Sequence, residues 1–178
     1  MKKIFTMVFT VCFLCIVLPS MAQKPGKLIS VGFGLEAGVP INKTTADVFN
    51  FNGGVTARFS LHAGPGFATF TTGGILFIPK NADVNSLKAS VQIPIKAGYK
   101  YIFVRHFFVM GELGYSVFNS YYGSGQNSNL HSTSTGGFTF APSLGLQFRV
   151  MELALRYESI QLSGGNLDYL GFRVGFNF

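Results

Sequence analysis

The stretch that decides the fold is VQIPIKAGYKYIF, from Val91 to Phe103. Its apolar residues are Val91, Ile93, Ile95, Ala97, Tyr99 and Tyr101, and between them stand Gln92, Pro94, Lys96, Gly98 and Lys100. This period of two is that of a β-strand, in which successive side chains point to opposite faces. The stretch also exceeds the roughly 9–11 residues that a strand needs to cross a bilayer. It therefore predicts a strand with one apolar and one polar face.

Seven further segments repeat this pattern. They start near Ile29, Val55, Phe67, Val109, Phe138, Leu153 and Tyr169. The segment Phe67 to Ile78 shows the weakest alternation, because its ILFI is apolar on both faces. Long connections near 40–52, 79–90, 119–136 and 161–167 alternate with short ones near 62–66, 103–106 and 149–151. An even number of strands with alternately long and short connections is the layout of an outer-membrane barrel.

An eight-stranded antiparallel barrel could also be a soluble, lipocalin-like cup with its apolar side chains inside. The aromatic residues of the apolar faces are Phe33, Phe59, Tyr99, Tyr101, Tyr115, Phe138, Phe140, Phe148, Tyr157, Phe172 and Phe176. The interior of eight strands is just wide enough for side chains, so these rings would overfill it. We therefore predict an all-β fold, an eight-stranded antiparallel up-and-down transmembrane β-barrel whose rings face lipid.

The composition and the first residues agree with export to a membrane. Only 12% of the residues are charged, against about 25% in an average chain. Lys2 and Lys3 precede an apolar run from Ile4 to Leu18, which small residues close. This is the pattern of a cleaved signal peptide, and the run falls short of the roughly 20 residues of a spanning helix. We expect a signal peptide at 1–22 and a barrel domain at 23–178.

Both cysteines, Cys12 and Cys15, lie in that predicted signal peptide. The mature chain is therefore expected to lack disulfides, a cysteine metal site and a cysteine nucleophile. Without Lys2 and Lys3, the mature chain has 12 of the 14 Lys and Arg residues and all 7 Asp and Glu residues. Because these bases are scattered singly rather than clustered, we predict no binding of nucleic acid.

The polar faces hold nine ionisable side chains of nearly balanced charge. They are Glu36, Arg58, Lys96, Lys100, Glu112, Glu152, Arg156, Glu158 and Arg173. Unpaired buried charges are costly, so we expect an ion-pair and hydrogen-bond network that fills the lumen. A gated ion path is the alternative, although interiors of this size are normally filled.

The quoted stretch, together with GLEAGVPI (Gly34 to Ile41), FFVMGELGYSVF (Phe107 to Phe118) and the terminal LGFRVGFNF, resembles a known family. These segments are similar to the small outer-membrane β-barrel proteins of the Bacteroidota type, which share their architecture with the transmembrane domain of OmpA and with OmpX. The resemblance implies that Phe172, Val174, Phe176 and Phe178 form the C-terminal signal read by the barrel-assembly machinery. Because the chain stops where the predicted barrel does, we expect it to lack the peptidoglycan-binding domain of OmpA proteins.

Catalytic and metal-binding patterns are weak. His62, His106 and His131 are far apart in the sequence, and none has a second histidine at metal-ligand spacing. HSTST, from His131 to Thr135, offers a serine near a histidine, but nothing in the sequence orients a base beside a nucleophile. We therefore expect no enzyme activity, no cofactor and no metal.

Several residues are candidates for the membrane interface or for surface contacts. Tyr99, Tyr101, Phe107, Phe148 and Tyr169 could form aromatic girdles. In the long connection 119–136, the candidate contacts are Tyr121, Tyr122 and His131, because binding residues often lie on loops. The two tyrosines could equally belong to the girdle. Pro94 and Pro142 each remove a backbone donor, so we expect bulges or ladder breaks there.

The expected function is a structural one in the outer membrane of a Gram-negative bacterium. The expected partners are membrane lipid and, during insertion, the barrel-assembly machinery, and we expect a monomer. Adhesion or recognition through the outer loops, chiefly 119–136, is the alternative from a binding class. A narrow channel is a third hypothesis.

Overall fold

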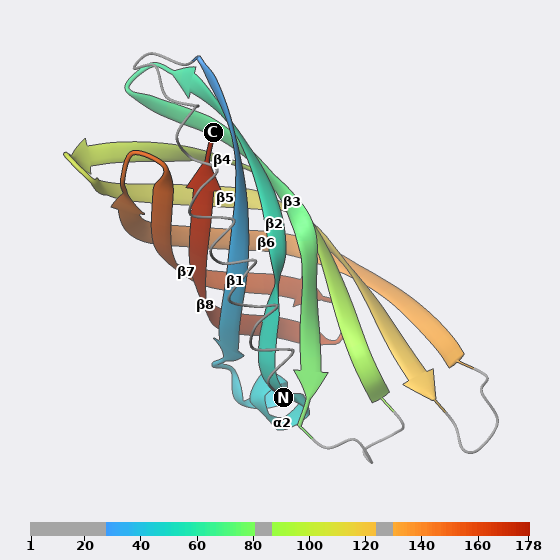
Figure 1. Ribbon diagram of the computed structural model, residues 1–178. Helices are drawn as coiled ribbons and strands as arrows, with labels where there is room; N and C mark the ends of the chain where they lie inside the picture. Colours follow the sequence, from blue (N-terminus) through green and yellow to red (C-terminus); the bar gives the residue numbers. More distant parts are fainter. Residues whose placement is uncertain (1–27, 81–86, 124–129) are drawn as a thin grey trace, which may run out of the picture.

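The computed structural model, drawn in Figure 1, describes residues 28–80, 87–123 and 130–178. The predicted signal peptide at 1–22 lies outside these residues. The elements are β1 (Ile29–Pro40), α2 (Lys43–Val48), β2 (Phe49–Ala63), β3 (Gly66–Pro79), β4 (Leu87–Val104), β5 (Phe107–Gly123), β6 (Leu130–Gln147), β7 (Met151–Leu162) and β8 (Gly165–Asn177).

The eight strands form a closed barrel in which each strand pairs antiparallel with its neighbours in the chain. β8 closes the barrel on β1, with Phe33 opposite Phe176 and Leu35 opposite Val174. Beyond β8, Phe178 donates its N–H to the carbonyl of Val31 at 2.8 Å. Closure gives every strand a paired neighbour on both sides, so the sheet has no free edge strand, which a bilayer could not hydrogen-bond. The predicted eight-stranded antiparallel barrel is confirmed.

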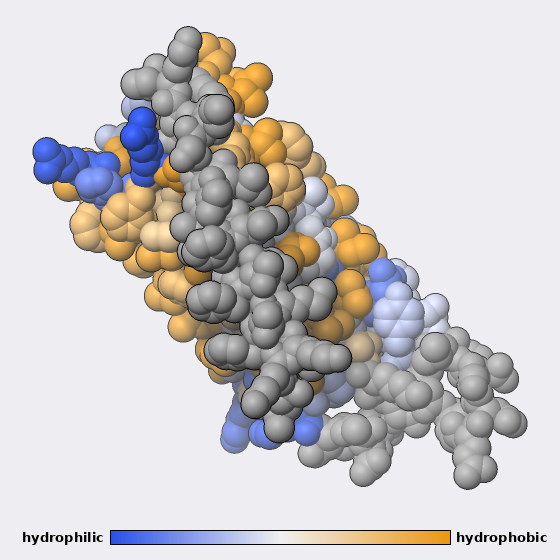
Figure 2. All heavy atoms as spheres, in the orientation of Figure 1, coloured by the Kyte–Doolittle hydropathy of each residue, from blue (hydrophilic) through white to orange (hydrophobic). Residues whose placement is uncertain are grey.

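The apolar faces of the strands form the outside of the barrel, as the hydropathy colouring of Figure 2 shows. Of the eleven aromatic residues assigned to the apolar faces, nine are exposed, and Tyr157 and Phe176 are half-buried. Phe33, for example, is 60% exposed, whereas Arg58 on the opposite face of its neighbouring strand is 1% exposed. This orientation excludes the lipocalin-like arrangement.

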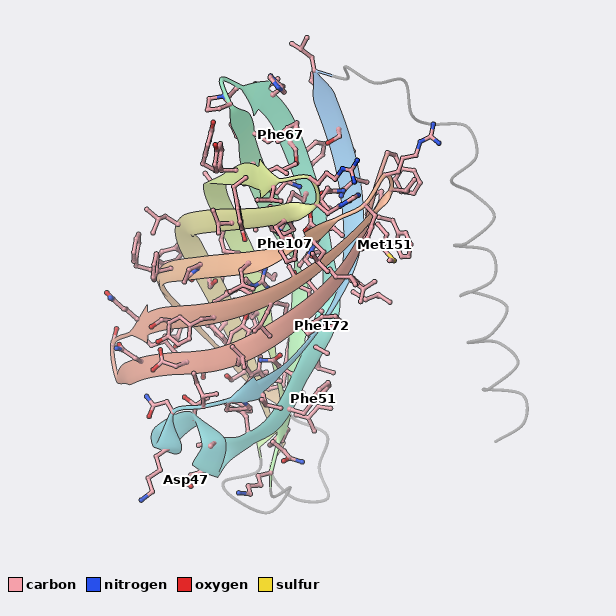
Figure 3. The ribbon with its side chains drawn as sticks, turned by 90° about the vertical axis from the view of Figure 1, so that its left-hand side faces the viewer. Asp47, Phe51, Phe67, Phe107, Met151 and Phe172 are labelled. Atoms are coloured by element: carbon pink, nitrogen blue, oxygen red, sulfur yellow. The ribbon has the colours of Figure 1, made fainter. Side chains whose placement is uncertain are left out.

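The two ends of the barrel differ. The α2 end carries α2 and the turn at Ser163 and Gly164, and the C-terminal end carries three short turns at 64–65, 105–106 and 148–150. In Figure 3, Asp47 of α2 marks the first end, and Phe67, Phe107 and Met151 lie towards the second. The three predicted short connections are confirmed at the C-terminal end.

Two of the predicted long connections are wrong. β5 continues to Gly123 and β6 begins at Leu130, so most of 119–136 is strand, and residues 161–167 hold only a two-residue turn. The strands extend beyond the segments of alternating apolar residues because backbone groups, and not side chains, form the hydrogen bonds between strands. Polar residues can continue the ladder where it rises out of the apolar zone. Residues 124–129, in the middle of the predicted loop, lie outside the described residues.

The two strand prolines interrupt the hydrogen-bonded ladder without shifting its register. Between β6 and β7, the pairs resume at Ser143 and Arg156 after a gap at Pro142. Between β3 and β4, a similar gap falls opposite Pro94, and in both cases the other neighbouring strand stays paired. Proline lacks the backbone donor, so each one opens the ladder on one side only. The predicted ladder breaks are confirmed, without bulges.

The helix α2 was not predicted. Ala46 donates its N–H to the carbonyl of Asn42 at 2.8 Å, so asparagine, a preferred N-cap residue, precedes the first turn. The side-chain amide of Asn42 also donates to a carboxylate oxygen of Asp168 at 3.2 Å. These bonds tie α2 to the start of β8.

No helix among the described residues is long and apolar enough to span a bilayer.

Candidate functional site in the charged lumen

All nine ionisable residues assigned to the polar faces lie inside the barrel, with exposed fractions of 8% or less. They come from six strands: Glu36 from β1, Arg58 from β2, Lys96 and Lys100 from β4, Glu112 from β5, Glu152, Arg156 and Glu158 from β7, and Arg173 from β8. Each stands at the alternate position whose side chain points to the axis. The structure thus brings all nine together in one space.

Glu152 holds three cations from three other strands. Its carboxylate accepts hydrogen bonds from Arg58 at 2.5 Å, from Arg173 at 2.8 Å and from Lys100 at 2.9 Å. Arg58 is on β2 and Glu152 on β7, which are not neighbouring strands, so this pair crosses the lumen. One carboxylate therefore ties β2, β4 and β8 to β7.

Glu36 and Arg156 form a second group. Glu36 is paired with Arg156 and lies 3.6 Å from the guanidinium of Arg173. Arg156 also approaches Glu158 at 3.1 Å and Glu112 at 3.8 Å. The arginine thereby links three of the four carboxylates, and each carboxylate has at least two cationic neighbours.

Uncharged side chains complete the network. Thr71 donates to Glu112 at 2.5 Å and accepts from Arg58 at 3.0 Å, and Thr56 donates to Glu36 at 2.8 Å. Thr71 comes from β3, which has no charged residue. These hydroxyls satisfy some of the hydrogen-bonding groups that the ion pairs leave without a partner, which lowers the cost of burying them.

Gln92 joins the charged network to Tyr169, from whose hydroxyl it accepts a hydrogen bond at 3.4 Å. It donates to Glu158 at 2.8 Å and to Ser116 at 3.0 Å, and Lys96 donates to the second oxygen of Glu158 at 2.6 Å. The sequence-based site omitted Gln92, Thr56 and Thr71 because they are uncharged. Their inward positions in the same alternation could have found them.

Apolar layers lie on both sides of the charged layer. Towards the α2 end, six buried residues form the plug, as we call this cluster: Ile75, Phe77, Phe118, Ile160, Leu167 and Tyr169. The ring centroids of Phe77 and Phe118 are 5.4 Å apart, and those of Phe77 and Tyr169 are 5.7 Å apart. Towards the C-terminal end lie Phe108, Met110 and Ala154. Lys100 sits 5.1 Å from the ring centroid of Phe108, in cation–π geometry.

The plug corrects the prediction for Tyr169 and explains the weak third segment. Tyr169 is 1% exposed and points into the lumen, so it is not part of an outer girdle. Odd-numbered residues of β8 face the axis, and Tyr169 precedes Arg173 on that face. In ILFI, Ile75 and Phe77 enter the plug while Leu76 and Ile78 face outward. The segment is apolar on both faces because the lumen itself is apolar at this depth.

The three candidate loop contacts are strand residues. Tyr121 is 38% exposed on β5, opposite Ser132, and the backbones of Tyr122 and His131 face each other across the β5–β6 ladder. The assignment of these three residues to a loop is therefore wrong. HSTST likewise lies on β6, in extended conformation.

Histidines and carboxylates do not gather into a metal site in the part of the chain that the structure describes. His62 lies on β2, with its ring centroid 5.2 Å from that of Phe67, and the ring of His106 lies 5.4 Å from that of Phe148. In the lumen, the carboxylates and the cations neutralise one another. The arrangement suits cross-linking of strands better than proton transfer or nucleophilic attack.

The four residues of the predicted assembly signal lie on the outward face. Phe172 is exposed, and Val174, Phe176 and Phe178 are half-buried. They share this face of β8 and its extension, which pairs with β1.

Solved structures of small barrels are similar to this one. The first is Ail, the attachment invasion locus protein of Yersinia pestis, solved in complex with the heparin analogue sucrose octasulfate. Its sequence is 12% identical to this one. The superposition covers 84% of this chain and 96% of Ail, with a TM-score of 0.58. The N-terminal barrel domain of Pseudomonas aeruginosa OprF has 10% identity, covers 84% and 97%, and gives 0.61. Neisserial surface protein A has 11% identity, covers 85% and 96%, and gives 0.55.

The chain has the fold of a small outer-membrane β-barrel. Identities of 10–12% establish the shared fold alone. No protein-family model and no curated protein sequence matches the chain.

Proposed function

We propose that the chain is an outer-membrane barrel with a filled polar lumen and a structural, non-catalytic role in the envelope. One observation carries this proposal: the nine-residue ion-pair network crosses the lumen and has an apolar layer on each side. Such an interior joins opposite walls of the barrel rather than leaving a passage. The finer assignment to the Bacteroidota type rests on the sequence resemblance.

Residence in the outer membrane is supported by the outer surface. Monomeric soluble proteins rarely expose a contiguous apolar patch larger than a few hundred Å². Here exposed Phe, Tyr, Leu, Ile and Val side chains cover the strands, as in Figure 2. On this proposal the α2 end faces the outside, and the three short turns face the periplasm, as in barrels of this class.

Fractionation together with gel migration tests this proposal. The full chain, expressed in a Gram-negative host, should appear in the outer-membrane fraction. It should migrate differently in detergent gels before and after boiling, because a lipid-inserted barrel stays folded in the detergent until it is heated. A soluble periplasmic product would contradict the proposal.

Recognition of a partner at the cell surface is the second candidate function. A cavity at the α2 end, lined in part by Ser120, Thr135 and Asn166, favours it. Ail was solved with a heparin analogue, which is highly anionic. Among the described residues at the α2 end of this barrel, Lys43 and Lys80 are accompanied by Asp47 and Asp168, so no purely basic surface is present there. We therefore expect this chain to favour a partner other than a sulfated sugar.

Replacing residues 124–129, which follow β5 and precede β6 in the chain, by a Gly-Ser linker tests loop-mediated recognition. Loss of binding of whole cells to a surface ligand, with an intact barrel, would support adhesion through this connection. Unchanged binding would count against it.

A further inference from the structure

A cup with a volume of about 410 Å³ opens at the α2 end of the barrel. It lies beside α2, whose Asp47 is labelled in Figure 3, and β4, β5, β6 and the β7–β8 turn complete its lining. Volumes of 300–1,000 Å³ are typical of small-molecule sites. The cup is therefore large enough for a ligand.

The floor of the cup is apolar and closed. Phe118 and Leu167 line it and belong to the plug, and Phe49 and Leu162 pack against the plug beside them. Within the plug, Tyr169 donates its hydroxyl proton to Gln92 at 3.4 Å, and Gln92 in turn donates to Glu158 of the charged network. A molecule that enters the cup meets packed side chains, so the geometry favours binding over passage.

The walls of the cup carry small neutral polar groups. Ser120 and Thr135 contribute hydroxyls and Asn166 an amide, and Ser90 lies 2.9 Å from the hydroxyl of Ser120. Among the described residues that line the cup there is no Asp, Glu, Lys or Arg. A charged ligand would lose hydration here without meeting an opposite charge, which is costly.

We infer that the cup binds an uncharged amphiphile, with its apolar part on the phenylalanine and leucine floor and its hydroxyl- or amide-bearing part against the walls. The chemical class is that of a neutral glycoside with a short alkyl or ring substituent. This inference rests on the second proposed function, recognition of a partner at the cell surface, and names the class of ligand. Its test requires only the folded barrel, so its result does not depend on whether the 124–129 connection mediates adhesion.

The chain lacks tryptophan, which provides a clean reporter. Phe49→Trp places a single indole at the cup, where Phe49 lies 5.3 Å from the ring of Phe77. The full-length variant, in vesicles of zwitterionic phospholipid, is titrated with hexyl glucoside below its micellar concentration. Hexyl sulfate and hexyltrimethylammonium are titrated in parallel. We expect a saturable change of tryptophan emission with the glucoside and at least tenfold weaker effects with the charged probes.

A blocking variant separates the cup from the bilayer. A side chain added at Gly164, which lines the cup, meets no atom within 4 Å at its Cβ position, and the same is true of Gly74 on the lipid-facing side of β3. In the Phe49→Trp background, Gly164→Phe should weaken glucoside binding at least tenfold. Gly74→Phe adds the same ring outside the cup and should leave binding unchanged.

Three outcomes would overturn the inference. A non-saturating response that is equal in Gly164→Phe and Gly74→Phe would mean that the probe only partitions into the bilayer. Equal affinity for a charged probe would refute the preference for an uncharged ligand. No change of emission in a variant that is folded by gel migration would refute binding. If Phe49→Trp does not fold, Leu162→Trp serves as the reporter in the same titration.

Discussion

Glu152 is the residue on which most cations of the lumen converge. Arg58, Lys100 and Arg173 all donate to it, and its side chain is fully buried. Removing one partner of a buried ion pair leaves the other charges uncompensated, which is far more costly than the pair is worth as a whole. The stability of the barrel should therefore depend on this carboxylate more than on any single surface charge.

Glu152→Gln should lower the free energy of unfolding by about 3–5 kcal/mol, because three cations lose their shared counter-charge. The measurement is a urea titration of the barrel in phospholipid vesicles. Asp47→Asn, on the exposed side of α2, is the control and should leave the midpoint unchanged. Equal midpoints for the two variants would show that the network contributes little.

Phe178 offers a residue-level test of the proposed assembly signal. Its backbone bonds to Val31 do not depend on the side chain. Phe178→Ala should therefore reduce the heat-modifiable fraction in the outer membrane of cells severalfold, with normal refolding of the purified chain into detergent. Phe140→Ala removes another outward-facing ring, from β6, and should not affect assembly. Equal assembly of both variants would argue against the signal.

Among the strands, β5 shows how the lumen limits side-chain size. Gly114 faces inward, and a Cβ there would lie 2.7 Å from the Cα of Lys96 on β4. Gly111, three residues earlier on the same strand, faces outward, and a Cβ there meets nothing within 4 Å. Crossing strands approach so closely at Gly114 that any larger residue must move the backbone.

Gly114→Ala should destabilise the barrel by about 1–3 kcal/mol, the usual cost of overpacking. Gly111→Ala is its matched control on β5 and should be neutral or slightly stabilising, because it adds apolar surface on the lipid-facing side. Urea midpoints of the two variants give the comparison. A Gly114→Ala barrel as stable as Gly111→Ala would mean that the strands can separate at no cost.

An outward-facing carboxylate of β8 contacts Asn42, the residue before α2. Asp168 accepts from the amide of Asn42 at 3.2 Å and from the hydroxyl of Tyr157 at 3.3 Å. Asp168→Ala should therefore speed amide hydrogen exchange in residues 43–48 about fivefold, the effect of losing about 1 kcal/mol of local stability. Exchange in β1 and β2 is the internal control and should not change. Unaltered exchange in α2 would show that the helix is held by other contacts.

Across the whole molecule, the lumen is layered from the α2 end to the C-terminal end. The neutral cup comes first, then the plug, then Gln92 and the charged network, and last the cluster of Phe108, Met110 and Ala154. Two apolar layers and a paired charged layer each oppose the passage of ions. The channel hypothesis thus meets three barriers in series.

Planar-bilayer recordings of the purified barrel should show no single-channel events. A variant with Phe77→Ser and Phe118→Ser should also stay silent, because the ion-pair network below the plug is intact. Stepwise currents in the wild-type barrel would contradict the filled lumen. Currents in the double variant alone would show that the plug, and not the network, closes the barrel.

The sequence predicted the eight strands and, for most strand residues, whether the side chain points into the lumen or outward. Alternation is a local property, so Lys96 could be placed inside and Ile95 outside without knowing any neighbour. The prediction was wrong where the same type of residue suits two environments, as an aromatic ring suits both the membrane interface and the apolar plug. Tyr169 carries a large ring and was assigned to a girdle, although its position in the alternation faces the plug. The polar segments at 119–123 and 130–136 were also predicted to be loop, because they lack alternating apolar residues. They are strand because a hydrogen-bonded strand outside the apolar zone does not need apolar side chains.

The sequence by itself determined that this chain forms eight strands with an apolar and a polar face, and that four acids and five bases share the polar one. Only the tertiary structure decided which of them meet. Arg58 and Glu152 are 94 positions apart, and their contact follows from the stagger of strands around a closed barrel. The depth of the plug and the cup above it depend on the same stagger. Alternation in the sequence determines whether a side chain points into the lumen or outward. Closure of the barrel determines its height along the barrel axis and the residues that it contacts.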